Sequence, residues 1–275
     1  MEVQKNIAGR LFTVITLMAA PVTTLLADSL PCVIEPTEKV ELGSPVVGVL
    51  AEIRVERGDQ VKKGQVVARL AAQVERKSVD LAMLKVNDYS EIQAATAALE
   101  HAKREKTRAV ILFKKSLVSK QALDKAVTEE TLARHRLEQA RENQKQSEQA
   151  LKLARAKLNQ RILRSPIDGI ITERYLSPGD RIQDQPIVRI AKVDPLRVEV
   201  IAPAKFFNQF KKGQSVEVTP KLPGFKTRRA KVIIIDRTID AASNTFRVTL
   251  ELANPDLKIP AGARCTVDME PAGNG

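Results

Sequence analysis

Two stretches of the sequence, GVLAEIRVERGDQV at residues 48–61 and GIITERYLSPGDRI at residues 169–182, decide the fold because the second repeats the first. At an offset of 121 residues they share an opening glycine, a central glutamate and a Gly-Asp pair followed closely by an apolar residue. In each copy apolar residues alternate up to the Gly-Asp pair, which is typical of a β-hairpin. Glycine gives the backbone the freedom that a tight turn requires, so Gly58 and Gly179 are the predicted turn glycines.

The sequence between the two copies has a helical character. Residues 74–160 contain no Gly and no Pro and are rich in Ala, Leu, Glu, Gln, Lys and Arg, which are good helix formers. Spacings of three and four alternate along two series of mostly apolar or small residues, which is typical of a coiled-coil seam. The series are Ile92, Ala95, Leu99, Ala102, Lys106, Ala109 and Phe113, then Leu123, Ala126, Glu130, Ala133, Leu137, Ala140, Gln144, Ser147, Leu151, Ala154 and Leu158.

The two series can be aligned, because facing residues in an antiparallel hairpin have a nearly constant sum of residue numbers. The alignment pairs Leu99 with Leu137 and Lys106 with Glu130, and it places the reversal near residue 118. Opposite charges at one seam position predict an ion pair that sets the register of the two helices. In the alternative, both side chains bend outward into solvent without meeting.

The reversal carries the sequence RAVILFKKSLVS at residues 108–119. Here Ser119 can cap the second helix, Leu112 can enter an apolar groove, and Arg108 can bind carbonyls or carboxylates at the end of a partner's helices. In the alternative, the same residues form an ordinary capped turn with one seam leucine and one surface arginine.

The N-terminal residues have the layout of an export signal. Lys5 and Arg10 precede an apolar stretch at residues 11–26, which predicts a signal peptide over residues 1–27. The apolar stretch is short for a membrane span of roughly 20 residues, so an uncleaved anchor is the weaker alternative.

The chain has two cysteines, Cys32 and Cys265, and both follow the predicted cleavage point. Disulfides persist in the oxidising compartment to which the signal would direct the chain. A bridge between the first mature strand and the last strand and a pair of unpaired thiols are both compatible with the sequence.

Composition excludes several classes of function. The formal charge of +12 favours acidic partners, but only 3% of residues are aromatic and the basic residues are interspersed with acidic ones, which argues against nucleic-acid binding. His101 and His135 both lie in the predicted hairpin, and no Cys/His cluster has the spacing of metal ligands. We therefore expect no catalytic residues, no metal and no cofactor, and the chain is predicted not to be an enzyme.

The two half-motifs resemble the halves of a biotinyl/lipoyl domain, which is a flattened β-sandwich with internal two-fold symmetry. In such carriers the modified lysine lies on the tight turn that joins the halves. Here the halves are joined by the predicted hairpin, so that turn and its lysine are missing. A biotin- or lipoate-carrying enzyme subunit is therefore the weaker alternative.

The spacing of Arg108, Leu112 and Ser119 resembles the tip motif of periplasmic adaptors, or membrane fusion proteins, of the HlyD-like and RND-type efflux family. The resemblance covers roughly residues 38–269. It implies a periplasmic adaptor of a Gram-negative cell that links an inner-membrane transporter, of RND or ABC type, to a TolC-type outer-membrane channel. It also implies self-association, commonly as a hexamer. A purely structural coiled-coil protein, which would not need the triplet, is a further alternative.

After residue 192 the sequence alternates in short runs, at residues 196–201, 215–219 and 246–251, separated by turn residues. This pattern predicts a small antiparallel β-barrel. Many RND adaptors continue into a membrane-proximal domain, whereas only residues 270–275 follow here, which leaves the class of transporter open.

These observations predict an elongated α+β protein. It combines a lipoyl-like β-sandwich, split by a long antiparallel α-helical coiled-coil hairpin, with a small antiparallel β-barrel. The predicted parts are the signal peptide at 1–27, the N-terminal strand and first half-motif at 28–73, the hairpin at 74–160, the second half-motif at 161–191, the barrel at 192–270 and the tail at 271–275.

Overall fold

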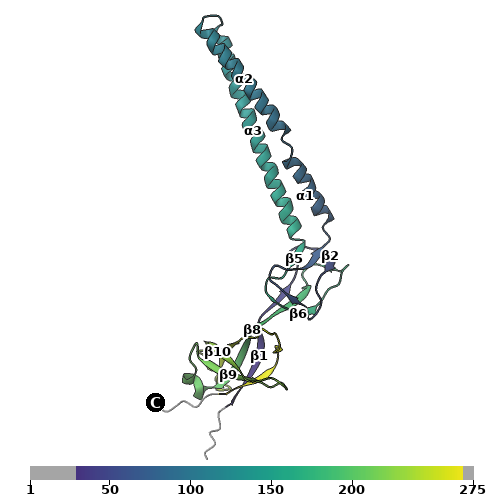
Figure 1. Cartoon of the computed structure of the whole chain (residues 1–275), viewed down its shortest axis with the longest axis vertical. Helices are drawn as coiled ribbons and strands as arrows, with labels where there is room; N and C mark the ends of the chain where they lie inside the picture. The colour runs from purple at the N-terminus through teal and green to yellow at the C-terminus, as the bar shows by residue number, and fades with distance from the viewer. Residues whose placement is uncertain (1–28, 269–275) are drawn as a thin grey trace, which may run out of the picture.

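A computed structural model describes residues 29–268 of the chain. The predicted signal peptide and C-terminal tail lie outside the described residues. The molecule is elongated, with a helical hairpin at one end, a β-sandwich in the middle and a β-barrel at the other end (Figure 1). Within residues 29–268, none of the helices combines the length and the apolar composition that crossing a membrane requires.

Residues 29–268 form β-strands, three consecutive α-helices between β4 and β5, and one 3-10 helix. In chain order the elements are β1 (Ser29–Leu42), β2 (Gly48–Ile53), β3 (Gln60–Val61), β4 (Val66–Leu70), α1 (Gln73–Val86), α2 (Ser90–Lys114), α3 (Lys120–Asn159), β5 (Ile162–Arg164), β6 (Gly169–Arg174), β7 (Arg181–Ile182), β8 (Val188–Pro203), the 3-10 helix η1 (Ala204–Gln209), β9 (Ser215–Pro220), β10 (Arg228–Ile235), β11 (Thr245–Leu252) and β12 (Arg264–Asp268). The predicted α+β class and the small barrel are confirmed.

The sandwich is built by exchange between the two sequence copies. Strand β2 of the first copy pairs with β7 of the second, and β3 pairs with β6, so the pairing is reciprocal. The two turns are reciprocal as well: the Gly58 N–H donates to Ile171 O, and the Gly179 N–H donates to Leu50 O, both at 2.8 Å. Both glycines have positive φ, of 96° and 99°. The hairpin predicted for each copy is present, because β2 pairs with β4 and β6 pairs with β8 in antiparallel fashion. The short strand directly after each turn, β3 or β7, joins the other copy in addition.

The barrel contains β9–β12 and shares β1 and β8 with the sandwich. Strand β1 pairs with β12 at its start and with β8 along most of its length, ending at the pair Leu42 and Val188. The predicted boundary between residues 191 and 192 therefore falls inside β8. A disulfide joins Cys32 to Cys265, which face each other across β1 and β12 and are both buried. One end of the core is covered by η1 and aromatic contacts to Phe246.

The hairpin leaves the sandwich between β4 and β5, and α2 packs antiparallel to α3. All seam positions predicted for the second arm are buried or half-buried in α3. The first arm is not one helix, because it breaks at residues 87–89 into α1 and α2. At this break Gln144 donates to Val86 O at 2.5 Å and Asp88 accepts the Ser90 N–H at 3.0 Å, so one backbone group at each new helix end gains a side-chain partner.

Candidate docking site at the hairpin tip

The reversal at the tip occupies residues 115–119, which include the predicted position 118. Helix α2 ends in a Schellman motif, in which the Leu117 N–H donates to Leu112 O and the Ser116 N–H donates to Phe113 O, both at 2.9 Å. Ser116 adopts the left-handed φ of 56° that this motif requires, a position where glycine is usual. The backbone of the tip is therefore fixed by hydrogen bonds within the hairpin.

Ser119 begins the second arm. Its side chain accepts a hydrogen bond from the Ala122 N–H at 3.2 Å, and its extended backbone is that of a helix N-cap. The hydroxyl oxygen thus stabilises the start of α3 and orients the loop before it.

Arg108 and Leu112 lie on the last turns of α2, at the same end of the hairpin as Ser119. The Arg108 guanidinium lies 3.1 Å from Glu105, but its side chain is 69% exposed, so it can reach a partner. Leu112 is half-buried. The more exposed apolar side chains at the tip are Leu117 at 68% and Ile111 at 50%.

Sequence analysis missed the roles of these last two residues. Leu117 lies between the two seams and Ile111 lies beside the first, so neither matched the alternating pattern. Phe113, predicted as the last seam residue of the first arm, is 39% exposed. The apolar run at residues 110–113 was the available signal, but only Leu112 was assigned to docking and Phe113 to the seam.

A groove of about 380 Å³ lies beside the tip. It is lined by Lys103, Lys106, Thr107, Val110, Ile111 and Glu130. Two lysines, the Glu130 carboxylate and the apolar end of α2 therefore meet on one face of the hairpin, and Arg108 is not among the lining residues. An acidic and partly apolar helical end would be complementary to this face.

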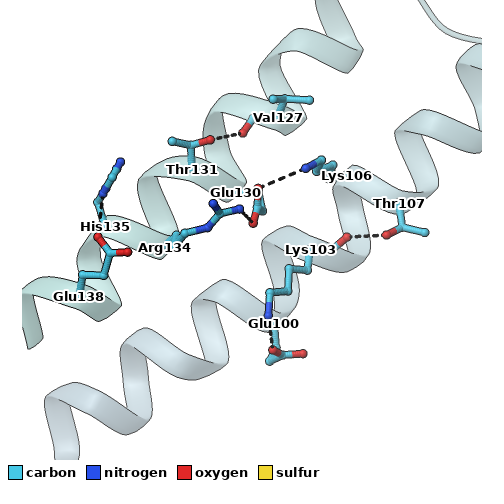
Figure 2. A network of polar contacts seen from close by, with 10 residues as sticks. All are labelled: Glu100, Lys103, Lys106, Thr107, Val127, Glu130, Thr131, Arg134, His135 and Glu138. Atoms are coloured by element: carbon cyan, nitrogen blue, oxygen red, sulfur yellow. Dashed lines mark hydrogen bonds and ion pairs between the residues drawn. The ribbon is translucent and has the colours of Figure 1, made fainter. Parts of the chain in front are cut away.

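Below the tip, Glu130 holds a three-residue ionic cluster in the seam (Figure 2). Its carboxylate lies 3.3 Å from the Lys106 Nζ and 2.5 Å from an Arg134 nitrogen, and its side chain is only 5% exposed. The hydrogen bond from Arg134, with a smaller contribution from Lys106, lowers the pKa of Glu130 although burial opposes the shift. Sequence analysis considered only pairs across the seam and so missed Arg134, which follows Glu130 by one helical turn.

We predict that Glu130 is coupled to both bases, and more strongly to Arg134. In double-mutant cycles with Glu130→Gln, the coupling to Lys106→Met should change the unfolding equilibrium constant by about two- to fivefold, and that to Arg134→Met by more. Chemical denaturation followed by helical circular dichroism measures both couplings. If the coupling between Lys106 and Glu130 were indistinguishable from zero, the prediction that this ion pair sets the register of the two helices would be wrong.

The two histidines do not form a site. His101 is exposed on α2, and His135 contacts Glu138 one turn along α3 at 3.1 Å. Within the part of the chain that the structure describes, no three His, Cys, Asp or Glu side chains gather in a way that could hold a metal ion.

Comparison with known proteins gives matches along most of the chain. The profile of the CzcB-like, barrel-sandwich hybrid domain family matches residues 38–192. The UPF0194 membrane protein of the asrC 5′ region of Acidithiobacillus ferridurans is 28% identical, over 81% of this chain and 81% of that protein. The cobalt-zinc-cadmium resistance protein CzcB of Cupriavidus metallidurans is 24% identical over 82% of this chain, which spans only 41% of CzcB. MacA from Actinobacillus actinomycetemcomitans superposes with a TM-score of 0.74 at 21% identity, covering 88% of this chain and 78% of MacA, so the two share a fold.

Proposed function

Because this chain belongs to the CzcB-like barrel-sandwich hybrid domain family, we propose that it is the periplasmic adaptor of a tripartite efflux or secretion system. The family predicted from the tip motif at the apex between the split halves is confirmed, and the chain is a non-enzymatic member of it. In the proposed system, the hairpin tip docks on a TolC-type outer-membrane channel. The barrel end faces an inner-membrane transporter of RND or ABC type.

The single observation that carries this proposal is the position of Arg108, Leu112 and Ser119 at the free end of a long helical projection. At 1.5 Å per residue, the 40 residues of α3 extend about 60 Å from the sandwich. We treat the hairpin as a two-helix coiled coil, in which the narrow seam leaves most of each helix free for partners. Docking would use Arg108 for acidic or carbonyl groups and the apolar tip residues for a groove between the channel's helices.

Self-association is part of the proposal. A two-helix coiled coil that projects from a small sandwich has little other support, and lateral packing of several copies, as in a hexamer, would cover its flanks. Export to the periplasm by the predicted signal at residues 1–27 completes the proposed localisation. The limits 28–73, 74–160, 161–191, 192–270 and 271–275 are our proposed domain divisions, with β1 and β8 shared between sandwich and barrel.

Nothing in the geometry favours the carrier alternative. The first sequence copy ends at Leu70 and continues through two alanines into α1, while the second begins after Asn159. The place where a carrier presents its modified lysine on a tight turn is thus occupied by the base of the hairpin. Intact-mass measurement of the purified chain should show no added biotin or lipoate.

Site-specific crosslinking in cells tests the proposed docking. A photoreactive amino acid at Leu117, at the tip, should give an adduct with a protein that fractionates with the outer membrane. The same group at Ile239, on the barrel, should give an adduct with an inner-membrane protein. Gln139, exposed at mid-arm, is the matched control and should give only adducts with further copies of this chain. If Leu117 and Gln139 gave the same products, the tip would have no special role and the adaptor proposal would fail.

A further inference from the structure

Arg161 lies where three parts of the molecule meet. It follows the end of α3 and comes directly before β5. Its main-chain carbonyl accepts a hydrogen bond from the Leu70 N–H at 2.9 Å, which fixes its backbone to the last strand of the first sequence copy. Figure 1 shows this region, around β5 and β2, at the base of the hairpin.

The Arg161 side chain contacts two other parts of the chain. One nitrogen donates to Val47 O, beside β2, at 3.0 Å. Another lies 2.7 Å from the Glu75 carboxylate in the first turn of α1. A single guanidinium therefore connects the end of α3 and the start of α1 to the edge of the sandwich.

This ion pair is better shielded from water than the others described. The Arg161 and Glu75 side chains are 21% and 18% exposed. In the seam cluster, by comparison, Lys106 is 38% exposed although its partner Glu130 is covered. Shielded ion pairs are weakened less by salt than exposed ones, so this contact persists at physiological ionic strength.

Gly48 provides the space for the guanidinium. A Cβ added at this position would lie 2.6 Å from Arg161 Nη1 and 3.1 Å from Leu70 Cδ1, so a side chain would push the guanidinium away. The matching residue of the second copy, Gly169, instead faces the carbonyl oxygen of Ala191, at 2.5 Å from its added Cβ. The two otherwise reciprocal copies thus differ at the position where the hairpin attaches.

We propose that Arg161 is a positioning residue that fixes the direction of the hairpin relative to the sandwich. Its planar guanidinium makes directional contacts to two separate elements, and this resists rotation of the hairpin about its two main-chain connections. Because the tip lies roughly 60 Å from the base, a tilt of about 10° at the base displaces the tip by about 10 Å. The proposal concerns the chain alone and holds whichever partner the tip contacts.

Distance measurement by double electron–electron resonance tests it without a transport assay. Nitroxide labels are placed on cysteines introduced at Gln139, on α3, and at Arg57, on the first sandwich turn, while Cys32 and Cys265 stay in their disulfide. Gln139 lies about 30 Å along the hairpin, so tilts of about 10° displace it by about 5 Å and spread the measured distance by up to about that amount. The original chain should give a narrow distribution, and Arg161→Ala should broaden it by that amount.

Arg164→Ala is the matched control. Arg164 lies on β5, three residues after Arg161, and donates to Gly64 O at 2.9 Å, a contact that stays within the sandwich. We expect a narrow distribution for this variant. Arg161→Lys, which retains the charge but cannot make both directional contacts, should give an intermediate width, and so should Glu75→Gln.

Two results would overturn the proposal. One is a narrow distribution in folded Arg161→Ala, and the other is equal broadening by Arg164→Ala, which would mean that any weakening of the sandwich loosens the hairpin. Should Arg161→Ala fail to fold, Glu75→Gln decides alone, because Glu75 lies in a helix rather than in the sandwich. If the width of the distance distribution were unchanged in Glu75→Gln, the proposal would then be wrong.

Discussion

Replacing Arg108 by aspartate is expected to abolish export by the proposed system while the chain still folds and reaches its compartment. The Arg108 side chain is 69% exposed, and its contact within the structure is a surface ion pair with Glu105, so little stability depends on it. At a docked interface, loss of a hydrogen-bonded charge costs about 2–5 kcal/mol, or at least about a thirtyfold loss of affinity, and the new carboxylate adds repulsion from acidic partners. Export of a substrate of the system, measured in cells lacking the original gene, is the readout.

Arg104→Asp is the matched control for this prediction. Arg104 is also exposed on α2, one helical turn farther from the tip, and the substitution makes the same change in charge. Leu112→Asp should behave as Arg108→Asp does, because a charged group cannot replace leucine in an apolar groove. Normal export by Arg108→Asp, or equal loss of export in Arg104→Asp, would show that the tip triplet is not the docking site.

Removing the disulfide by Cys32→Ala together with Cys265→Ala is expected to lower the thermal stability of the barrel severely. The bridge spans 233 residues of sequence, and opening a loop of that size restores conformational entropy to the unfolded chain worth up to about 5 kcal/mol. For a protein of this size such a loss corresponds to a fall of roughly 10–20 °C in melting temperature. Scanning calorimetry measures this fall.

Reductant provides the control for this second prediction. A reducing agent should destabilise the original chain by a similar amount and leave the double variant unchanged. If the double variant melted within a few degrees of the original chain, the strand pairing of the barrel would hold it closed without the bridge, and the predicted dependence on an oxidising compartment would be lost.

The parts of the fold that could be predicted from the sequence are those in which residue types recur at regular intervals. The repeat of 121 residues was visible because the two copies make reciprocal contacts, so the same residue types are needed twice, as at Gly58 and Gly179. The seam of α3 was visible because one face of a helix has to be covered along its whole length.

Non-periodic features escaped the sequence analysis. The seam pattern of the first arm begins only at Ile92, but it does not show that the helix breaks before that residue or that Gln144 of the opposite arm bonds to Val86 O there. Asn254 lies among the turn residues that follow the alternating run at residues 246–251. It is fully buried, and its side chain bonds to Val193 O and to both backbone groups of Ile259, which fastens the loop before β12 onto β8. Its role depends on where β8 lies, and residue spacing carries no information about that.

The reciprocal pairing in the sandwich also imposes an order on folding. The partner of strand β3 is β6, which is synthesised more than a hundred residues later. The edges of the first half-motif therefore stay unpaired until then. The intervening helices make local contacts and can form first. As they close against each other they bring Leu70 and Ile162 together and remove most of the loop-closure cost of joining the two halves. The hairpin is thereby expected to act as an internal folding guide for the sandwich, before it has any partner to reach.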